Sequence, residues 1–353
     1  MICQNHIGFS DINQLAALQK AFFDCIAKVS AMKALIHDNG LQFSPQWPKP
    51  KPGPGEALVR VRMAGICKTD HEIERGYMNF TGVLGHEFVG EVEWVNHDAY
   101  QHLPGKRVVG EINCGCNICS RCMQGLAAHC MARTVIGIAG RDGSLAEYLA
   151  IPTASLHIVP DAVSDRSAVF VEPLAAAFQI MAQVHIRPTD RVCVLGDGRL
   201  GLLAALALKL GPSAPDLVGK HPDKLAIASN QKIYTILLEE MPPEQTYDLV
   251  IEATGRPEGF ETARRIVRPR GRVVLKSTLT ESGACSLTPL VQNEITLVGS
   301  RCGPFAPALR ALTENRLDVT PLITVVYPLD AALDAFEASR APHALKVLVA
   351  PSG

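Results

Sequence analysis

The pattern of hydrophobic and polar positions changes near residue 166. Before it, apolar and polar residues alternate in three runs: ALVRVRMAGI at 57–66, FVGEVEWV at 88–95 and KRVVGEI at 106–112. A period of two puts successive side chains on opposite faces of a strand. We therefore expect an antiparallel β region here, of the kind that often curls into a partial barrel.

After residue 166, short β-rich runs alternate with helical stretches or loops. The runs are RVCVLG (191–196), APDLVG (214–219), YDLVIEAT (247–254), GRVVLKS (271–277) and EITLVG (294–299). Strands that alternate with helices are typical of a parallel, doubly wound sheet. EITLVG could supply an exposed edge for self-association.

The C-terminal part resumes a mixed pattern, with helices expected near 306–316 and 330–340 and a closing strand at 344–350. The segment PQWPKPKPGPGE (45–56) is rich in Pro and Gly, which predicts a surface loop. A strand is expected from Met32 onward.

Residues 1–31 are interpreted as an N-terminal extension. Apolar residues recur at helical spacing between Ile12 and Ile26, which predicts a short amphipathic helix. The extension lacks the basic start, apolar stretch and cleavage site of a secretory signal. It is either a genuine extra helix or the product of an upstream start, and we favour the upstream start.

Composition limits the possible functions. A chain of 353 residues suggests two domains, and 47% hydrophobic with 20% charged residues is ordinary for a globular protein. A net charge of −1 provides no field that would attract nucleic acid or an anionic membrane. No apolar run approaches the roughly 20 residues that span a bilayer. The partner is therefore expected to be a small molecule.

Eleven cysteines without an export signal favour metal binding in a reducing compartment, so we expect a cytoplasmic protein. Four of them, within the segment 114–130, have the tight spacing that brings thiolates around a tetrahedral zinc ion: Cys116, Cys119, Cys122 and Cys130. Cys114 is a fifth candidate that the even spacing disfavours. With four protein ligands the site would be closed and structural.

The string GDGRLG (196–201) lies between a β-branched strand and an apolar helix. In that context Gly196 permits a tight turn, Gly198 lets the backbone approach a pyrophosphate, and Gly201 lets helix and strand pack closely. Arg199 and Leu200, at the helix start, complete the candidate dinucleotide site.

The end of the second strand reads Gly219-Lys220-His221. NAD enzymes usually carry Asp or Glu there, which holds the ribose 2′-hydroxyl. Because these three positions hold no carboxylate and offer a cation, they favour NADP, with NAD as the alternative.

A second, open metal site is predicted from Cys67 in GICKTD (65–70), His86 and Glu87 in GHE (85–87), and Glu172 in VEPLAAA (171–177). A catalytic zinc takes about three protein ligands and keeps a position for water or substrate. One thiolate, one imidazole and one carboxylate meet that requirement, and either Glu87 or Glu172 could be the carboxylate.

In their order along residues 32–350, these motifs resemble the zinc-containing medium-chain dehydrogenase/reductase family, which includes alcohol, sorbitol and threonine dehydrogenases. FVGEV after GHE, and DLVIEATG (248–255), add to the resemblance. It implies an α/β protein with a GroES-like, partly open β-barrel catalytic domain (32–165 and 301–353) and a Rossmann cofactor domain (166–300). It also implies a dimer or tetramer.

The resemblance further implies roles for single residues. Cys67, His86 and Glu87 match the zinc ligands of the polyol-type members, and Glu172 matches a glutamate that can join or leave the metal. Thr69 matches the hydroxyl that passes the alcohol proton outward, and Lys346 matches a basic residue near the cofactor phosphates. The expected reaction is hydride transfer between an alcohol, favoured as polyol or sugar-like, and NAD(P).

Three positions depart from the family pattern. Asn117 follows the first cysteine of the cluster, where glycine is frequent, and Glu72 stands where many members have a relay histidine. His71 is one residue early and is only a weak candidate for that relay. The N-terminal extension matches nothing in the family. Two alternatives are a zinc-free quinone or enone reductase of the same fold and a non-catalytic nucleotide-binding sensor.

Overall fold

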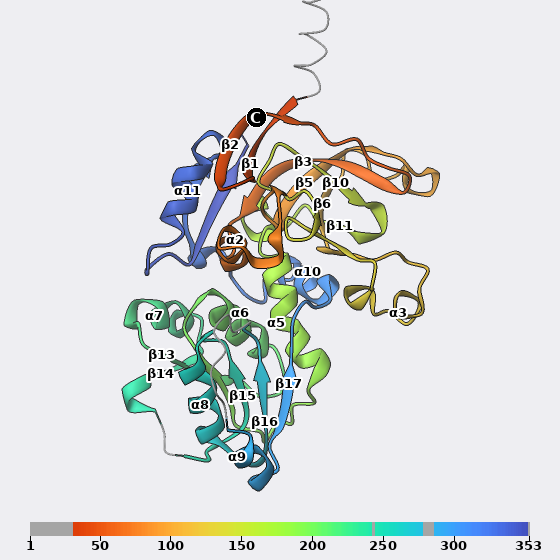
Figure 1. Ribbon diagram of the computed structural model, residues 1–353. Helices are drawn as coiled ribbons and strands as arrows, with labels where there is room; N and C mark the ends of the chain where they lie inside the picture. The colour runs from red at the N-terminus through yellow and green to blue at the C-terminus, as the bar shows by residue number, and fades with distance from the viewer. Residues whose placement is uncertain (1–30, 242–243, 278–285, 352–353) are drawn as a thin grey trace, which may run out of the picture.

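The computed structural model describes residues 31–241, 244–277 and 286–351, so the helix expected in the N-terminal extension lies outside the described residues. A six-stranded sheet forms the lower half of the molecule in Figure 1. Its order is β14-β13-β12-β15-β16-β17, and all neighbouring strands run parallel. The strands are β12 (Val192–Leu195), β13 (Pro215–Gly219), β14 (Tyr234–Leu237), β15 (Tyr247–Glu252), β16 (Val267–Leu275) and β17 (Thr296–Gly299).

This sheet confirms the doubly wound fold predicted from the alternating runs. The chain starts in the middle at β12, builds outward to β14 and returns to build the other side from β15. Such a reversal opens a crevice at the carboxyl ends of the two central strands, where open α/β sheets bind their ligands.

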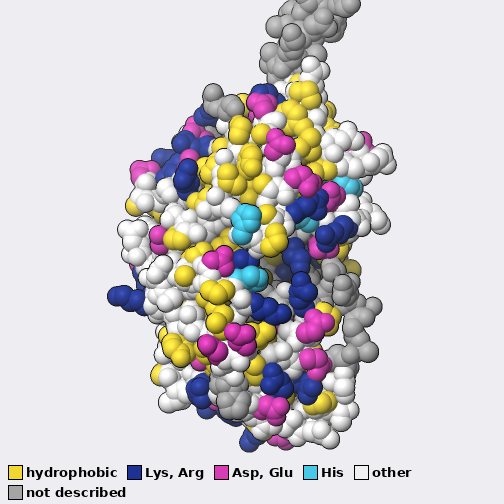
Figure 2. Space-filling view, turned by 90° about the vertical axis from the view of Figure 1, so that its left-hand side faces the viewer, with side chains coloured by type: hydrophobic (Ala, Val, Ile, Leu, Met, Phe, Trp, Pro, Cys, Tyr) yellow, Lys and Arg dark blue, Asp and Glu magenta, His cyan; other side chains and the backbone are white. Residues whose placement is uncertain are grey.

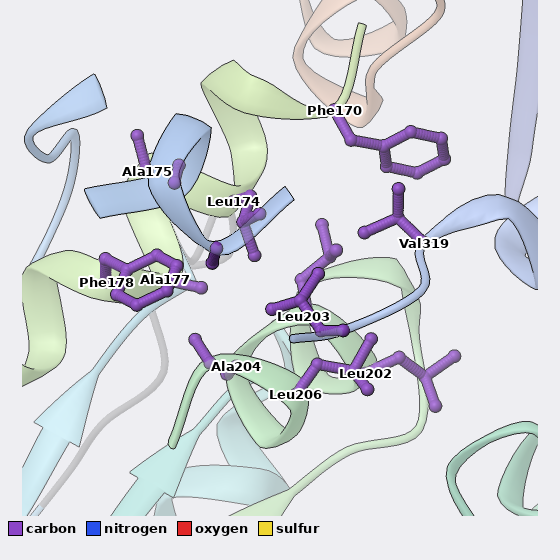
Figure 3. Packing of buried hydrophobic residues seen from close by; sticks show 14 of the residues in the cluster. Phe170, Leu174, Ala175, Ala177, Phe178, Leu202, Leu203, Ala204, Leu206 and Val319 are labelled. Carbon is purple, nitrogen blue, oxygen red and sulfur yellow. The ribbon is translucent and has the colours of Figure 1, made fainter. Parts of the chain in front are cut away.

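α6 (Arg199–Leu208), α7 (Pro222–Asn230) and α8 (Pro257–Ile266) pack against the sheet, because their apolar faces need cover. α5 (Val171–Gln183) packs on α6, and α10 (Phe305–Thr313) packs on α5. In the short helix α9 (Thr288–Gln292) no residue is buried. In α6 every residue from Gly201 to Leu208 is buried. Figure 3 shows Phe170, Leu174 and Phe178 at or near α5, close to the apolar side chains of α6.

The upper half contains a mainly antiparallel sheet in which the C-terminal strands β18 and β19, which pair parallel, join strands from the first half of the chain (Figure 1). Its order is β11-β6-β5-β3-β19-β18, with β10 also paired to β3. The C-terminal strand β19 pairs antiparallel with β3, next to the metal-site motifs. The strands are β3 (Glu56–Gly65), β5 (Glu87–Val95), β6 (Arg107–Gly110), β10 (Tyr148–Pro152), β11 (Leu156–Ile158), β18 (Ile323–Pro328) and β19 (Lys346–Ala350).

Two small sheets and four helices complete this half. The first sheet contains β1 (Ala31–His37), β2 (Leu41–Pro48) and β4 (Gly82–Val83). The second contains β7 (Asn113–Cys114), β8 (Thr134–Ile136) and β9 (Gly140–Arg141). The α-helices are α2 (Lys68–Glu74), α3 (Ser120–Met123), α4 (Asp165–Ala168) and α11 (Ala332–Ala338).

The predicted loop at 45–56 is partly wrong, because β2 extends through Pro48. β2 lies at the edge of its sheet, where proline is tolerated since one side of the strand donates to no neighbour. The indole Nε1 of Trp47 also donates to Asp142 at 3.0 Å.

Within the described ranges no helix is long and apolar enough to cross a bilayer. Basic and acidic side chains are interspersed over the face in Figure 2.

Candidate functional site

Cys67, His86 and Glu87 come together in the structure. The Sγ atom, a ring nitrogen and a carboxylate oxygen of these residues lie within 4.8 Å of one another. Cys67 precedes helix α2, while His86 and Glu87 lie at the start of β5, so α2 and β5 jointly position the group. One sulfur, one nitrogen and one oxygen donor fit a catalytic zinc site with an open position.

Asp70 holds two members of this group, a role that the sequence reading did not assign. Its Oδ2 accepts from the backbone N–H of Cys67 at 2.8 Å, and its Oδ1 lies 3.4 Å from His86 Nδ1. Although burial opposes the charge, His86 and the N–H of Cys67 hold the pKa of Asp70 below its usual value. A carboxylate on one ring nitrogen orients the other towards a metal. The sequence signal that could have identified this role is an acidic residue three positions after the helix N-cap, here Asp70 after Cys67.

Glu172 lies outside the group of three ligand atoms, near His86 and Glu87. Burial raises the pKa of Glu172 to about 7, against the opposing charges of His86 and Lys346. Lys276, immediately after β16, is a further buried neighbour whose pKa is lowered by burial to about 8. Its Nζ donates to Ser300 Oγ at 3.1 Å. The structure thus places Glu87, not Glu172, with Cys67 and His86.

Lys346 is joined to the candidate metal group by its pairing with Glu87. Its ammonium forms an ion pair with Glu87 Oε2, and its side chain is 2% exposed. β19 lies beside β3 and directs the lysine onto Glu87 at the start of β5, and the phosphate-contacting role stays a prediction.

Replacement of Lys346 by Met is expected to lower the free energy of unfolding by about 3 kcal/mol, because it leaves the buried Glu87 carboxylate without its cation. Urea denaturation measures this loss. Lys33→Met removes a surface pair with Asp330, in which both side chains are more than a third exposed, and should cost at most about 1 kcal/mol. Equal losses in the two variants would contradict the assigned pairing.

Two further predicted residues lie close by. Thr69 Oγ1 is 3.7 Å from Cys67 Sγ, so its hydroxyl reaches the edge of the ligand group. His71 points elsewhere: its Nε2 is 2.8 Å from Ser339 Oγ and its ring packs on Phe336. Burial and the charge of Arg340 lower the pKa of His71 to about 4. These contacts do not join His71 to the ligand group, and its relay role stays a prediction.

The glycine loop has the close backbone approach that the fingerprint predicts. Gly196 has a φ of +119°, and a Cβ on Gly201 would lie 1.8 Å from the Gly196 carbonyl oxygen. A Cβ on Gly198 would meet nothing within 4 Å, so this side of the loop is open. Gly198 also caps α6 with no side-chain hydrogen bond, which leaves helix N–H groups for an anion. These features fit a dinucleotide pyrophosphate.

The loop touches the metal-site half directly. Arg199, at the start of α6 beside Leu200, donates through Nη1 to the carbonyl of Ile66 at 2.8 Å. Ile66 immediately precedes Cys67, so one contact joins the dinucleotide loop to the candidate metal group. Lys68, which the sequence reading did not single out, reaches the same crevice: its Nζ lies 3.3 Å from the position of a Cβ on Gly255, past the end of β15.

The end of β13 corrects one premise of the cofactor prediction. Gly219, Lys220 and His221 have no carboxylate of their own, but Asp197 of the glycine loop brings one there. Its Oδ2 accepts from the backbone N–H groups of Lys220 and His221, each at 2.7 Å.

The four predicted cysteines form a second group. Their sulfur atoms are 3.5 Å apart for Cys119–Cys122, 3.6 Å for Cys116–Cys130, 3.8 Å for Cys119–Cys130 and 4.0 Å for Cys116–Cys122. Sulfurs about 2.3 Å from a tetrahedral zinc ion lie about 3.8 Å from one another. The group can therefore hold a metal ion, and Cys114 does not belong to it.

The surroundings shift the pKa values of two cluster thiols in opposite directions. The N–H groups of Ile118 and Cys119 lower the pKa of Cys116 to about 6, whereas burial raises the pKa of Cys122 to about 12. Asn117 adopts a left-handed φ of +59°, which explains why glycine suits this position and why asparagine is accepted. The departure at Asn117 thus keeps the turn.

Comparisons with known proteins agree with this geometry. Residues 53–161 match the model of the alcohol dehydrogenase GroES-like domain. The chain is 30% identical over 342 residues to a sorbitol dehydrogenase of Halalkalibacterium halodurans, covering 91% of this chain and 99% of the relative. An alcohol dehydrogenase of Escherichia coli CFT073, solved with NADH, has a TM-score of 0.83 at 26% identity, covering 91% of this chain and 99% of that one.

A Sinorhizobium meliloti 1021 protein, described as a candidate zinc-binding dehydrogenase and solved with NADP, has a TM-score of 0.82 at 27% identity, covering 91% of this chain and all of its own. The fold and the two cysteine-containing groups thus define an oxidoreductase that acts on CH–OH groups. The chain belongs to the zinc-containing medium-chain dehydrogenase/reductase family.

Proposed function

We propose that the chain is a zinc-dependent polyol or sugar-alcohol dehydrogenase that uses NAD(P). One observation carries the proposal: Arg199 of the dinucleotide loop donates to the carbonyl of Ile66, the residue before Cys67, which supports a candidate metal group close to the bound nucleotide. Relatives solved with NADH and with NADP support the cofactor class.

We assign Cys67, His86 and Glu87 as ligands of the catalytic zinc, with Glu172 as the carboxylate nearby. When bound, zinc supplies Lewis acidity to an alcohol oxygen, and the nicotinamide supplies a hydride acceptor. Asp70 keeps His86 oriented, and Lys346 holds Glu87. The Thr69 hydroxyl, beside Cys67, accepts the proton of the substrate hydroxyl and passes it outward. Contact between the two halves through Arg199 helps to exclude water.

The surroundings of Glu172 support a substrate with several hydroxyl groups. The Lys276 ammonium and the Cys302 thiol both lie near Glu172, and burial raises the pKa of Cys302. Asn113 Nδ2 lies 3.2 Å from Cys302 Sγ. Polar groups around a pocket fix the orientation of a polar substrate. The sorbitol dehydrogenase relative favours the same class.

The proposal includes a cytoplasmic location and a homo-oligomer. β17 ends the parallel sheet, and Leu297 on it is 41% exposed, which supports this strand as a contact edge between copies.

A panel of primary alcohols, secondary alcohols, polyols and hydroxy amino acids, followed by the absorbance of NADH and NADPH, tests the proposal. We expect turnover of polyols and two zinc ions per chain by elemental analysis, one for each group of ligands. A zinc-loaded preparation that binds nucleotide but oxidises no alcohol would favour the non-catalytic sensor. Reduction of quinones by zinc-free protein would favour the reductase alternative.

A further inference from the structure

Asp197 occupies the space that a side chain on the end of the second strand would fill. β13 ends at Gly219, and a Cβ built there would lie 2.5 Å from both Cβ and Oδ2 of Asp197. The two residues belong to different segments, yet they share one position at the edge of the crevice. Any larger residue at position 219 would collide with Asp197, which reaches across from the glycine loop, so glycine suits this position.

Hydrogen bonds fix the Asp197 carboxylate at this position. Its Oδ2 accepts from the N–H groups of Lys220 and His221 at 2.7 Å, and the His221 ring Nδ1 is 3.0 Å from Oδ2 and 3.1 Å from Oδ1. Although burial opposes the charge, these groups of His221 and Lys220 hold the pKa of Asp197 below its usual range. The carboxylate is thus ionised at neutral pH.

The hydrogen bonds leave one oxygen able to accept more. A carboxylate can accept about four hydrogen bonds, and both backbone donors go to Oδ2. Oδ1 has the longer, shared contact with the His221 ring. The Asp197 side chain remains 10% exposed, whereas His221 is 49% exposed at the rim.

The charge at this point separates the two nicotinamide cofactors. A carboxylate at the end of the second strand accepts from the 2′-hydroxyl of the adenine ribose in NAD. A 2′-phosphate in its place would bring a second anion against it. The backbone N–H groups of Lys220 and His221, which could otherwise bind phosphate, already serve Asp197.

We propose that Asp197 is the residue that determines cofactor specificity, and that it selects NAD(H) over NADP(H) by supplying from the glycine loop the carboxylate missing from position 219. This inference rests on the proposed function, since it concerns the nucleotide of that same crevice. It reverses the preference for NADP expected from Gly219-Lys220-His221 alone, because the sequence of these three positions does not show that the Asp197 carboxylate lies against them.

The test is direct binding of NADH and NADPH to the full-length protein, with the dissociation constants taken from nucleotide fluorescence. The natural chain should bind NADH at least about tenfold more tightly than NADPH. Asp197→Asn keeps the size and an acceptor oxygen but removes the charge. It should reduce that preference by about tenfold, the typical effect of losing one charge-assisted hydrogen bond.

A double variant makes the test independent of damage to the loop. Asp197→Gly combined with Gly219→Asp moves the carboxylate to the usual strand position, where the space is then free. It should restore the preference for NADH. Asp223→Asn, which removes an exposed carboxylate from the start of α7, is the matched control and should leave the ratio unchanged.

Tighter binding of NADPH by the natural chain, or an NADH preference that Asp197→Asn leaves intact, would overturn the inference while the proposed function stands. An equal shift in Asp223→Asn would also overturn it, because the effect would then come from general charge. Binding of neither nucleotide would overturn the proposed function itself. Circular dichroism of each variant verifies that it is folded.

Discussion

Replacement of Cys67 by Ala is expected to lower turnover of the best alcohol substrate by roughly a thousandfold or more, while NADH still binds. The variant removes the only sulfur donor from the group formed with His86 and Glu87. Lewis-acid activation is worth several kcal/mol, and about 4 kcal/mol corresponds to a thousandfold in rate. Steady-state absorbance gives the rate, and nucleotide fluorescence gives the dissociation constant.

The same preparation should lose one of its two zinc ions, since the cysteine cluster is a separate group. Cys193→Ala is the matched control, because it removes a buried thiol from β12 that takes no part in either group. It should keep both ions and most of the turnover. Full activity in metal-free Cys67→Ala protein would remove the basis of the proposed mechanism.

Much of the fold follows from local pattern. The parallel sheet was predictable because short β-rich runs alternate with helical stretches, as in the buried strand β12 and the apolar helix α6 that follows it. The antiparallel half was predictable from alternation, as β3 shows where the buried Val59 and Val61 alternate with the exposed Arg60 and Arg62. The two prolines of β2 misled the prediction, because the tolerance of an edge strand for proline depends on which strands pair.

The ligand sets were predictable for a similar reason. The cluster cysteines lie within one short segment, so their spacing already constrains their geometry, and His86 and Glu87 are adjacent. Contacts between distant segments were not predictable. Lys346 meets Glu87 from 259 positions away, and Asp197 meets His221 from 24 positions away. Only the assembled sheets bring these residues together.

Replacement of Cys119 by Ala is expected to lower the stability of the protein by an amount on the order of 5 kcal/mol, because a structural zinc contributes its binding energy to folding. Cys119 lies 3.5 Å from Cys122 and 3.8 Å from Cys130, so its loss opens the tetrahedral group. The segment 114–130 has only short helices and no buried apolar face of its own in α3. Differential scanning calorimetry should show a lower Tm, and elemental analysis should show one zinc ion fewer.

Met123→Ala provides the matched control within the same segment. Its side chain is 75% exposed, so its removal should change neither the zinc content nor the Tm. Removal of zinc by a chelator should lower the Tm of the natural chain more than that of Cys119→Ala, because the variant has already lost this contribution. If Cys119→Ala kept the full zinc content and the Tm of the natural chain, the cluster would not be a structural metal site. Stability in this segment would then have to come from its other hydrogen bonds, such as the one that Arg301 Nη2 donates to the carbonyl of Ala128 at 2.8 Å.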